Sequence, residues 1–584
     1  MDNYFDLHFH PVAKNFLSRY HEPEKEEIST LMETVKMSKA FMDFTDEVAL
    51  RTLESQCSIE QMKTGKVNFG VAAVSALEFG MVSSKGFFSD LIKSSLTKPF
   101  DKYYFEAVRE GTVSYLNLFL REVAQYKKLV DEGKVKMYTH KNYREGFSEN
   151  KPNLMLSIEG GHNLSIKKIG NSLDSDDFEN YDSELFFDPK TESSLHPAEV
   201  LGRLVEYLRD WNMDVLYLGL THMTHIPEQH LATHAFGTKR LKHPSFYPFG
   251  NGLSDLGKEV VEKAYGLRYP VDDNPNSNDC EETESRHRPV LIDVKHLSLK
   301  SRLDLYELRK GKYENIPLIA SHVGVTGYSI NDWKDNLDTN RCTNHVDQGI
   351  KTVKIYTKPK VAGYHGSNVK TEFVYNPCTL NLMDEDIIEV ANSRGMIALG
   401  LDVSLLGYES QPTGSYDAYE FLSTADFTYH FRYNSIRSLN FTGLQEIRSE
   451  EAWLKPEKNK LHPLSLCFNI VHIVAVIALR TDIEDPWKHI CVGSDFDGFI
   501  EPLTVCSSSA HMKDLESTLH QWLPVAAEKY REENGGASDL FEFAEKRSVL
   551  EKVVQGILYD SGVRFVTDYF ATEKKEIEES LEAS

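Results

Sequence analysis

Cysteine is scarce in this chain and never paired in sequence. The 584 residues include seven cysteines, none of them in a Cys-x-x-Cys arrangement. A small, odd and scattered set is typical of reduced thiols, not of a disulfide framework or a structural zinc site. We therefore expect a protein of a reducing compartment, and the cytoplasm is the predicted location.

Basic residues are also in deficit. Lys and Arg number 65 against 89 Asp and Glu, so the formal net charge is −24. Proteins that bind nucleic acid need positive charge to contact phosphates, and no nucleic-acid partner is expected here. An acidic surface aids solubility, and the charge is compatible with a cationic cofactor such as a metal ion.

No apolar run is long enough to cross a bilayer. The longest run, Leu464–Leu479, is interrupted by His472 and is shorter than the roughly 20 residues that a membrane-spanning helix needs. The start, Met1–His10, lacks the basic end and apolar core of a signal peptide. We expect a buried helix at Leu464–Leu479 and no membrane partner.

Eight apolar runs of strand length recur along the chain. Several are rich in Val and Ile, as strands buried on both faces are. Helical patterns lie between them, for example over Tyr104–Glu132 and over Asp384–Ala391 before Gly395. This alternation predicts an α/β fold, a closed (β/α)8 TIM barrel. The expected strands are Tyr4–His8, Val67–Val74, Leu154–Ile158, Val215–Leu220, Val290–Val294, Leu318–Ser321, Met396–Leu401 and Ile490–Gly493.

Four polar or mixed segments interrupt this repeat. We interpret them as long loop insertions in one barrel that spans residues 1–584, because barrels exceed 400 residues when their loops are extended. Loops of this length are usually functional or disordered. The insertions are Asn171–Ser194, Tyr269–His287, Asn331–Tyr375 and Tyr408–Lys460.

The last two insertions follow the sixth and seventh expected strands, so they should overhang the rim where such barrels carry their active sites. We expect them to narrow the pocket or to form a dimer contact. The alternative is that they are surface insertions with no role in function. The aromatic residues that they contribute include Trp333, Tyr364, Tyr416, Tyr419 and Phe427.

Acid or imidazole residues follow six of the expected strands or lie at their ends. His8 and His10 are two residues apart, so their side chains point to one face of a strand and can bind one ion. Glu159 precedes Gly160 and Gly161, which allow a sharp turn. Each residue alone also fits an ordinary polar strand end. A barrel brings its strand ends to one rim, however, so the set predicts a di-metal site. The candidate ligands are His8, His10, Glu159, His296, His322 and Asp495.

Two further side chains are candidates for proton transfer and carbonyl binding. Asp495 ends the last strand, where a carboxylate can bind metal and accept a proton from water. His222 ends the fourth strand and can polarise a carbonyl. Their neighbours fit simpler roles: Asp497 is expected to cap the following turn or to orient the loop, and His225 is expected to be a loop residue.

Taken together, these motifs resemble the membrane dipeptidase (renal dipeptidase) family of the amidohydrolase superfamily. The resemblance runs from Asp6 to about Phe570, broken by the insertions, with the motifs in the family's order. The matching pieces are Asp6–His10, Ser157–Leu164 (SIEGGHNL), Leu218–His222 (LGLTH), Gly252–Val261 (GLSDLGKEVV), Leu291–Ser298 (LIDVKHLS), Ile319–His322 (IASH), Asn381–Ile387 (NLMDEDI) and Val492–Gly498 (VGSDFDG).

The resemblance implies a zinc-dependent hydrolase that cleaves a dipeptide or another small amide. It implies that Glu159 bridges two zinc ions, or other divalent metal ions. His8 and His10 would complete one ion's ligands, and His296 with His322 the other's. Catalysis would fall to Glu159, to Asp495 as general base, and to His222 as the residue that binds the substrate carbonyl and stabilises its oxyanion. The family often forms dimers, so a homodimer is possible on this ground alone.

Two positions depart from the family's pattern. The family begins with His-x-Asp where this chain has His8-Phe9-His10, so a neutral ligand replaces an anionic one. Leu380 stands where the family has an arginine for the substrate carboxylate, and Arg341, within an insertion, is a candidate substitute. A related hydrolase that acts on a lactone, a cyclic amide or an N-acyl group is therefore an alternative. A non-catalytic barrel with a binding role is another, although the complete ligand set argues against it.

Overall fold

A computed structural model provides the structure of the chain. It describes residues 1–20, 28–36, 52–83, 100–169, 196–226, 229–238, 241–270, 285–365, 371–410, 418–431, 463–535 and 546–571. The predicted insertion at 171–194 lies outside these residues, as do Tyr416 and most of the segment that ends at Lys460.

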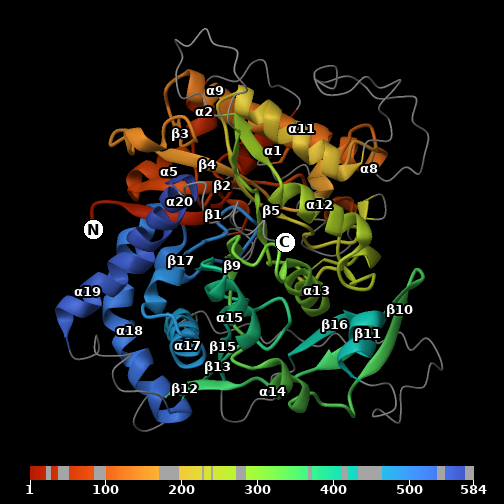
Figure 1. Ribbon diagram of the computed structural model, residues 1–584, viewed down its shortest axis with the longest axis vertical. Coiled ribbons are helices and arrows are strands. Elements are labelled where there is room, and N and C mark those ends of the chain that lie inside the picture. Colours follow the sequence, from red (N-terminus) through yellow and green to blue (C-terminus); the bar gives the residue numbers. More distant parts are fainter. Residues whose placement is uncertain are drawn as a thin grey trace.

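A sheet of eight parallel strands in chain order forms the centre of the molecule, with the short β3 (Lys136–Met137) beside β4 (Figure 1). Backbone hydrogen bonds of 2.9 Å from His10 N to Phe496 O and from Asp495 N to His8 O join the last strand to the first. The sheet therefore closes into the predicted barrel, and all eight predicted strands are confirmed. They are β1 (Tyr4–Phe9), β2 (Val67–Val74), β4 (Asn153–Ile158), β5 (Val215–Gly219), β8 (Leu291–Asp293), β9 (Leu318–Val323), β14 (Met396–Leu399) and β17 (Ile490–Val492).

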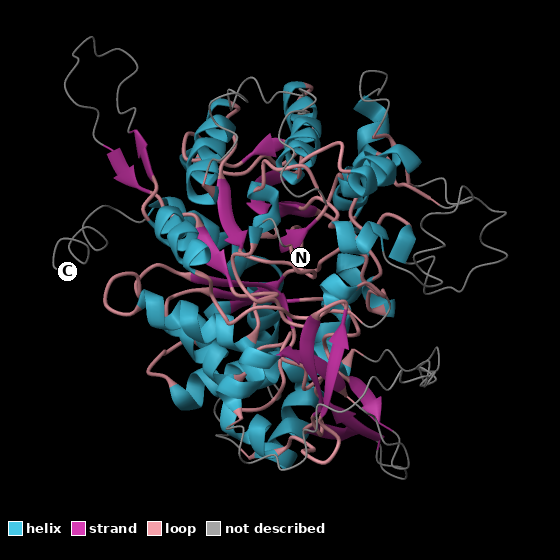
Figure 2. Ribbon diagram, turned by 90° about the vertical axis from the view of Figure 1, so that its right-hand side faces the viewer, coloured by secondary structure: helices cyan, strands magenta, loops and turns pink. Residues whose placement is uncertain are grey.

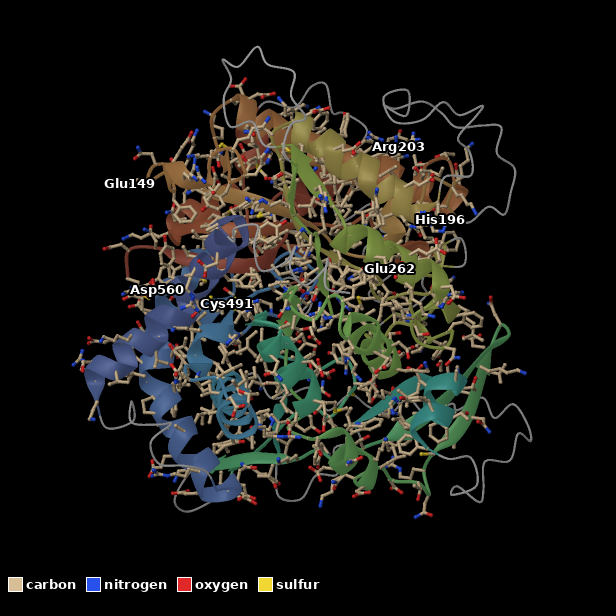
Figure 3. The ribbon with its side chains drawn as sticks, in the orientation of Figure 1. Glu149, His196, Arg203, Glu262, Cys491 and Asp560 are labelled. Atoms are coloured by element: carbon tan, nitrogen blue, oxygen red, sulfur yellow. The ribbon has the colours of Figure 1, made fainter. Side chains whose placement is uncertain are left out.

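Helices cover the outside of the barrel, which explains why its strands are apolar throughout. Every residue of β1, β4 and β9 is buried. The covering helices are amphipathic: Arg203 and Glu262 lie on their outer, solvent-facing sides (Figure 3). Helices of this outer layer include α9 (Tyr115–Asp131), α11 (Pro197–Asp210), α12 (Asp255–Tyr265), α13 (Leu299–Arg309), α15 (Asp384–Asn392), α17 (Leu464–Arg480), α18 (Met512–Asn534), α19 (Arg547–Gln555) and α20 (Ser561–Ala571). The other α-helices are α1 (Ala13–Ser18), α2 (Ile28–Met32), α5 (Ile59–Thr64), α6 (Phe79–Ser83), α8 (Lys102–Glu110), α14 (Ile330–Asp335) and α16 (Thr424–His430).

One helical prediction needs correction. The apolar spacing over Tyr104–Glu132 continues through two helices, α8 and α9, and not one. Gly111 ends α8 with a left-handed backbone (φ 65°), and the Ser114 side chain then accepts a hydrogen bond from Asn117 N to start α9. A glycine C-cap followed closely by a serine N-cap interrupts the backbone without interrupting the apolar pattern.

The apolar run near Leu464 forms α17, a buried helix as predicted. His472 within it is satisfied, because its ring nitrogens contact Asp384 Oδ1 at 2.8 Å and the Tyr530 hydroxyl at 3.0 Å. Among the described helices, none combines the length and apolar character that a bilayer crossing requires.

The insertions that follow β9 and β14 build two small antiparallel sheets, apart from the central one (Figure 2). One is β10 (Thr343–Asp347), β11 (Ile350–Tyr356) and β16 (Tyr419–Ser423); the other is β12 (Val361–His365), β13 (Thr371–Val374) and β15 (Tyr408–Ser410). In the predicted insertion at 269–287, β6 (Arg268–Pro270) pairs with β7 (Ser285–His287). Long segments that break the barrel repeat thus contain secondary structure of their own.

The β10–β11–β16 sheet has one face on a core of its own. Trp333 and Phe427, two aromatic residues expected at the pocket, lie in this separate core with Val353 and Ile355. Trp333 is fully buried and its indole N–H donates to Pro377 O at 3.1 Å. These two rings therefore stabilise the insertion and do not shape the barrel mouth.

Candidate active site

Six buried ligand candidates converge at the carboxyl ends of five barrel strands. They fall into two groups in which the possible ligand atoms lie within 4.8 Å of one another. The first group contains His8, His10, Glu159 and Asp495, and the second contains Glu159, His296 and His322. The structure thus brings together every residue that the sequence nominated as a metal ligand.

Glu159 is the residue that the two groups share. Its Oε2 lies 3.5 Å from His10 Nε2, whereas its Oε1 lies 3.4 Å from His296 Nε2. Oε1 is also 3.3 Å from His8 Nε2 and 3.7 Å from His322 Nε2. Oε1 thus faces histidines of both groups and Oε2 faces His10 of the first, so this one carboxylate lies between the groups, as a bridging ligand must.

A hydrogen-bond relay sets the tautomer of His8. The Tyr217 hydroxyl donates to Leu7 O at 3.1 Å, so its oxygen is free to accept from His8 Nδ1 at 2.8 Å. His8 then carries its proton on Nδ1 and presents the Nε2 lone pair to Glu159 and Asp495. Outer partners of this kind orient the histidine ligands of metal sites.

The second group contains two histidines whose nitrogens face each other. His296 Nε2 and His322 Nε2 are 3.0 Å apart, and Ser321 Oγ lies 2.7 Å from His322 Nδ1. A serine hydroxyl there can accept the Nδ1 proton, which leaves the His322 Nε2 lone pair directed at His296 and Glu159.

Two buried aspartates fasten the strand ends that carry these ligands. Asp6 Oδ1 accepts from His8 N at 3.2 Å and from Ser494 N at 2.9 Å, so it joins the ends of β1 and β17. Asp293 Oδ1 does the same for β8 and β9, through Lys295 N at 3.0 Å and Ser321 N at 3.1 Å. Sequence reasoning missed this function of both aspartates, although each precedes a predicted ligand within its motif.

Two of the candidate ligands have strained backbone conformations. His296 (φ 65°) and Asp495 (φ 61°) adopt the left-handed region that side chains rarely occupy, a feature that clusters at functional sites. Gly160 has φ 92°, and a Cβ there would lie 2.5 Å from the His162 ring and 3.1 Å from His222 Cβ. The predicted need for glycine after Glu159 is confirmed at this position.

His222 lies beside the shared carboxylate and is held by Glu78, an acid that is not among the residues predicted from the sequence. Its Nε2 is 3.7 Å from Glu159 Oε1, and its Nδ1 contacts the buried Glu78 Oε2 at 3.1 Å. Burial lowers the pKa of His222, but Glu159 and Glu78 outweigh it and raise that pKa to about 9. Glu78 follows β2, so an acid shortly after a predicted strand was the available signal.

The protonation states of three ligand candidates, Glu159, His296 and His322, suit a cation. Burial acts to raise the pKa of Glu159, but the imidazoles of His222 and His8 hold it well below its ordinary value. Burial lowers the pKa of His296 to about 3 and that of His322 well below the usual range. Metal ligation needs this combination of ionised carboxylate and neutral imidazole.

His10 behaves differently. Burial lowers its pKa, yet the nearby carboxylates of Asp495 and Glu159 outweigh burial and raise that pKa to about 9. Two carboxylates that attract a proton at this point also attract a metal ion there. The Nε2 atoms of His8 and His10 are buried without a hydrogen-bond partner. Such orphaned lone-pair nitrogens next to carboxylate oxygens fit a divalent metal ion that takes N and O ligands.

The remaining nominated residues lie in different surroundings. Asp497 orients a loop as expected, but this loop is far away in the sequence. The Asp497 carboxylate accepts a hydrogen bond from Gln56 N at 2.7 Å and pairs with Lys14 Nζ at 2.9 Å. His225 is a loop residue whose ring packs on Phe249, with centroids 4.5 Å apart. The Arg341 guanidinium lies 3.8 Å from the centre of the Tyr356 ring, on the insertion.

The second face of the insertion sheet meets the loop that follows His222. Phe421 of β16 packs on Phe236 and Tyr247 with ring centroids 4.9 and 4.8 Å apart, and His345 of β10 packs on Tyr247 at 4.3 Å. The backbone beside Phe236 contacts the ligand group directly, because Ala235 N donates to His296 O at 2.7 Å. The insertion thus packs against a loop at the barrel rim, as expected from its position after β9.

No protein-family model matches the sequence, and no curated protein matches it. Solved structures do match, at low identity and over nearly the whole chain. The crystal structure of the dipeptidase AC, a metallopeptidase, has 13% identity and a TM-score of 0.44, covering 98% of this chain and 99% of that chain.

Two more of these structures have comparable values. A metallopeptidase from Rhodobacter sphaeroides, liganded with a phosphinate mimic of the dipeptide L-Ala-D-Ala, has 13% identity, a TM-score of 0.41, and coverage of 97% of this chain and 98% of that chain. The probable dipeptidase PvdM from Pseudomonas aeruginosa has 13% identity, a TM-score of 0.34, and coverage of 88% and 89%.

Proposed function

We propose that this chain is a metal-dependent hydrolase that cleaves an amide bond in a small molecule, with a dipeptide as the leading substrate. The observation that carries the proposal is the position of Glu159, whose carboxylate lies within 3.7 Å of buried histidines from both ligand groups. A protein with only a structural or binding role has no need for this arrangement.

Two zinc ions are the cofactors that we propose. His8, His10 and Asp495 would hold one ion and His296 with His322 the other, with Glu159 shared between them. Ions at these places supply Lewis acidity, which activates water and polarises a carbonyl group. Nitrogen and carboxylate ligands of this kind suit zinc, and other divalent metals accept them as well.

Asp495 is the proposed general base. Its Oδ1 lies 3.7 Å from His8 Nε2 and 3.6 Å from His10 Nε2, so it borders the point where water would be activated. A carboxylate there can take the proton of the attacking water and pass it to the leaving amine. Its backbone is fixed for this role by the hydrogen bond from Asp495 N to His8 O.

His222 is the proposed binding group for the attacked carbonyl. The ion pair with Glu78 keeps the imidazole protonated, so Nε2 can donate to an oxygen as negative charge develops on it. Glu78 acts through His222 and is a positioning residue.

A related hydrolase acting on a lactone, a cyclic amide or an N-acyl group is the second candidate. Leu380 at the place of the family's arginine favours it, because an apolar side chain there provides no charge for a substrate carboxylate. We further propose a cytoplasmic location, which the absence of disulfides among the six described cysteines supports, and a single barrel unit over residues 1–584. A homodimer stays a prediction.

A substrate panel tests the function. Purified protein loaded with zinc is assayed against dipeptides of both stereochemistries at the second residue, an N-acyl amino acid, a cyclic amide and a lactone. Hydrolysis of dipeptides, abolished in Asp495→Asn, is the expected result. Turnover of only another class would support the second candidate, and a metal-loaded protein that hydrolyses none of them would contradict the hydrolase proposal.

A further inference from the structure

Lys295 is a buried cation without a partner, next to the proposed ligand His296. The side chain is 2% exposed, and its ammonium nitrogen has no hydrogen-bond partner. Among the described residues it also forms no ion pair, whereas the buried Lys14 pairs with Asp497 at 2.9 Å. An isolated buried ammonium is costly, and a native protein rarely retains one without a reason.

The position of Lys295 directs it to the mouth of the barrel. It lies two residues beyond the end of β8, in the turn that leads to His296. Asp293 fastens the ends of β8 and β9 inside the barrel. The carboxylates whose charges act on the Lys295 ammonium lie at or just beyond the carboxyl ends of four barrel strands: Asp495, Asp402, Asp293 and Glu159.

Each of these four carboxylates is already engaged elsewhere. Asp293 accepts from two backbone N–H groups. Asp402 accepts from Ser404 N at 3.0 Å and from Ser404 Oγ at 2.6 Å. Glu159 and Asp495 belong to the ligand groups. The ammonium is therefore available to an anion that enters from outside the protein.

We propose that Lys295 binds the carboxylate of the substrate, so that the enzyme selects small amides with a free carboxylate group over neutral ones. This inference rests on the proposed function and specifies its substrate class. A cation fixed beside the ligand groups would hold the anionic end of a dipeptide while its amide lies at Glu159 and Asp495. The charge-assisted hydrogen bond would be strong because the site is buried.

The test compares a dipeptide with its C-terminal amide. For the wild type we expect kcat/KM to favour the free acid about 10- to 100-fold, as expected for one buried charge-assisted contact. Lys295→Met should remove most of that preference by raising KM for the acid, with little change for the amide. Lys295→Arg, which keeps the charge, should retain part of the preference.

Lys354→Met is the matched control. Lys354 is also a buried lysine, but it lies on β11 of the insertion sheet, 3.9 Å from the centre of the Tyr419 ring. This variant should keep the wild-type preference. Elemental analysis of every variant accompanies the kinetics. If Lys295→Met reduced turnover of acid and amide equally, or changed the metal content instead of the preference, Lys295 would have another role and the inference would be wrong.

A binding experiment separates this inference from the hydrolase proposal. Calorimetry measures binding of N-acetylalanine and of its amide to the metal-loaded wild type and to Lys295→Met, whether or not either compound is cleaved. Tighter binding of the acid that disappears in the variant supports the inference even if the substrate panel fails. Equal binding of acid and amide by the wild type overturns it even if dipeptides are hydrolysed.

Discussion

The two ligand groups are built by different means. His8 and His10 come from a single strand and reach one face because they are two residues apart. His296 and His322 come from the ends of two strands, and His296 needs a left-handed backbone to meet its partner. Local spacing is therefore enough to align the two histidines of the first group, whereas those of the second meet only through the barrel and a strained turn.

The groups also differ in charge. Two carboxylates, Glu159 and Asp495, belong to the first group, but only Glu159 belongs to the second. Lys295, a cation, acts on both histidines of the second group. Since divalent ions bind more tightly where negative charge is greater, we expect the first group to hold its ion more firmly than the second.

Removing the shared charge should have the largest effect, because it affects both groups. Glu159→Gln is expected to lower the metal content from about two equivalents to below one and to reduce kcat/KM about 10³-fold or more, since both water activation and carbonyl polarisation depend on the ions. Elemental analysis and kinetics on the same preparation check this. Glu122→Gln, a change at another buried glutamate outside the ligand groups, should keep two equivalents.

Breaking one group at a time should reveal the difference between them. His322→Ala should lose the ion of the second group and keep the first, leaving about one equivalent that resists chelation. His10→Ala should leave ions that a mild chelator removes more readily. Either change should lower kcat/KM about 10²-fold or more, because both ions act on the reaction. Equal chelator sensitivity of the two variants would contradict the charge difference between the groups.

A smaller effect is expected from a change at Glu78, because this residue acts on the reaction only through His222. Without the ion pair to Glu78, the pKa of His222 should fall from its value of about 9. The imidazole would then lose its proton at a lower pH than in the wild type. Glu78→Gln should therefore shift the basic limb of the kcat/KM profile to lower pH and cost about 10- to 100-fold, as for other partners of site histidines. An unchanged limb would show that His222 does not act as a protonated hydrogen-bond donor to the substrate oxygen.

The smallest effect concerns stability and not chemistry. Burial raises the pKa of Glu122 to about 8, and the charge of Glu159 adds to this although His10 opposes it. Above the ordinary pKa of a glutamate the unfolded chain loses this proton first, so folding stability falls as pH rises between about 4.5 and 8.

Glu122→Gln should remove that dependence. The variant is expected to gain about 1 to 4 kcal/mol relative to wild type at pH 8 and to match it near pH 5. Thermal unfolding at the two pH values measures the difference. A gain of the same size at both would mean that the effect comes from packing and not from ionisation.

The sequence predicted the barrel strands and the candidate ligands, but not the residues that act beside those ligands. All eight strands were predictable because a doubly covered parallel strand is apolar along its whole length. The ligands were predictable because closure brings strand ends together. Glu78, Tyr217 and Lys295 were not identified as site residues, because their roles depend on which side chain lies opposite, and only the three-dimensional structure specifies that.

The insertions show a second limit of the sequence. Their place after β9 and β14 predicted contact with the rim, and Phe421 does pack on the loop after His222. Which aromatic residues make that contact could not be predicted. Neighbouring residues of a strand point to opposite faces, so Leu422 belongs to the inner core while Phe421 faces the rim, and Trp333 reaches that core from helix α14.

The most direct test of the account is the metal content of the purified wild-type protein, followed during titration with a chelator. We predict about two zinc equivalents per chain, lost in two steps, with the second step requiring more chelator than the first. No bound metal after incubation with zinc, or a single equivalent that Glu159→Gln leaves in place, would contradict a site in which Glu159 serves two ions.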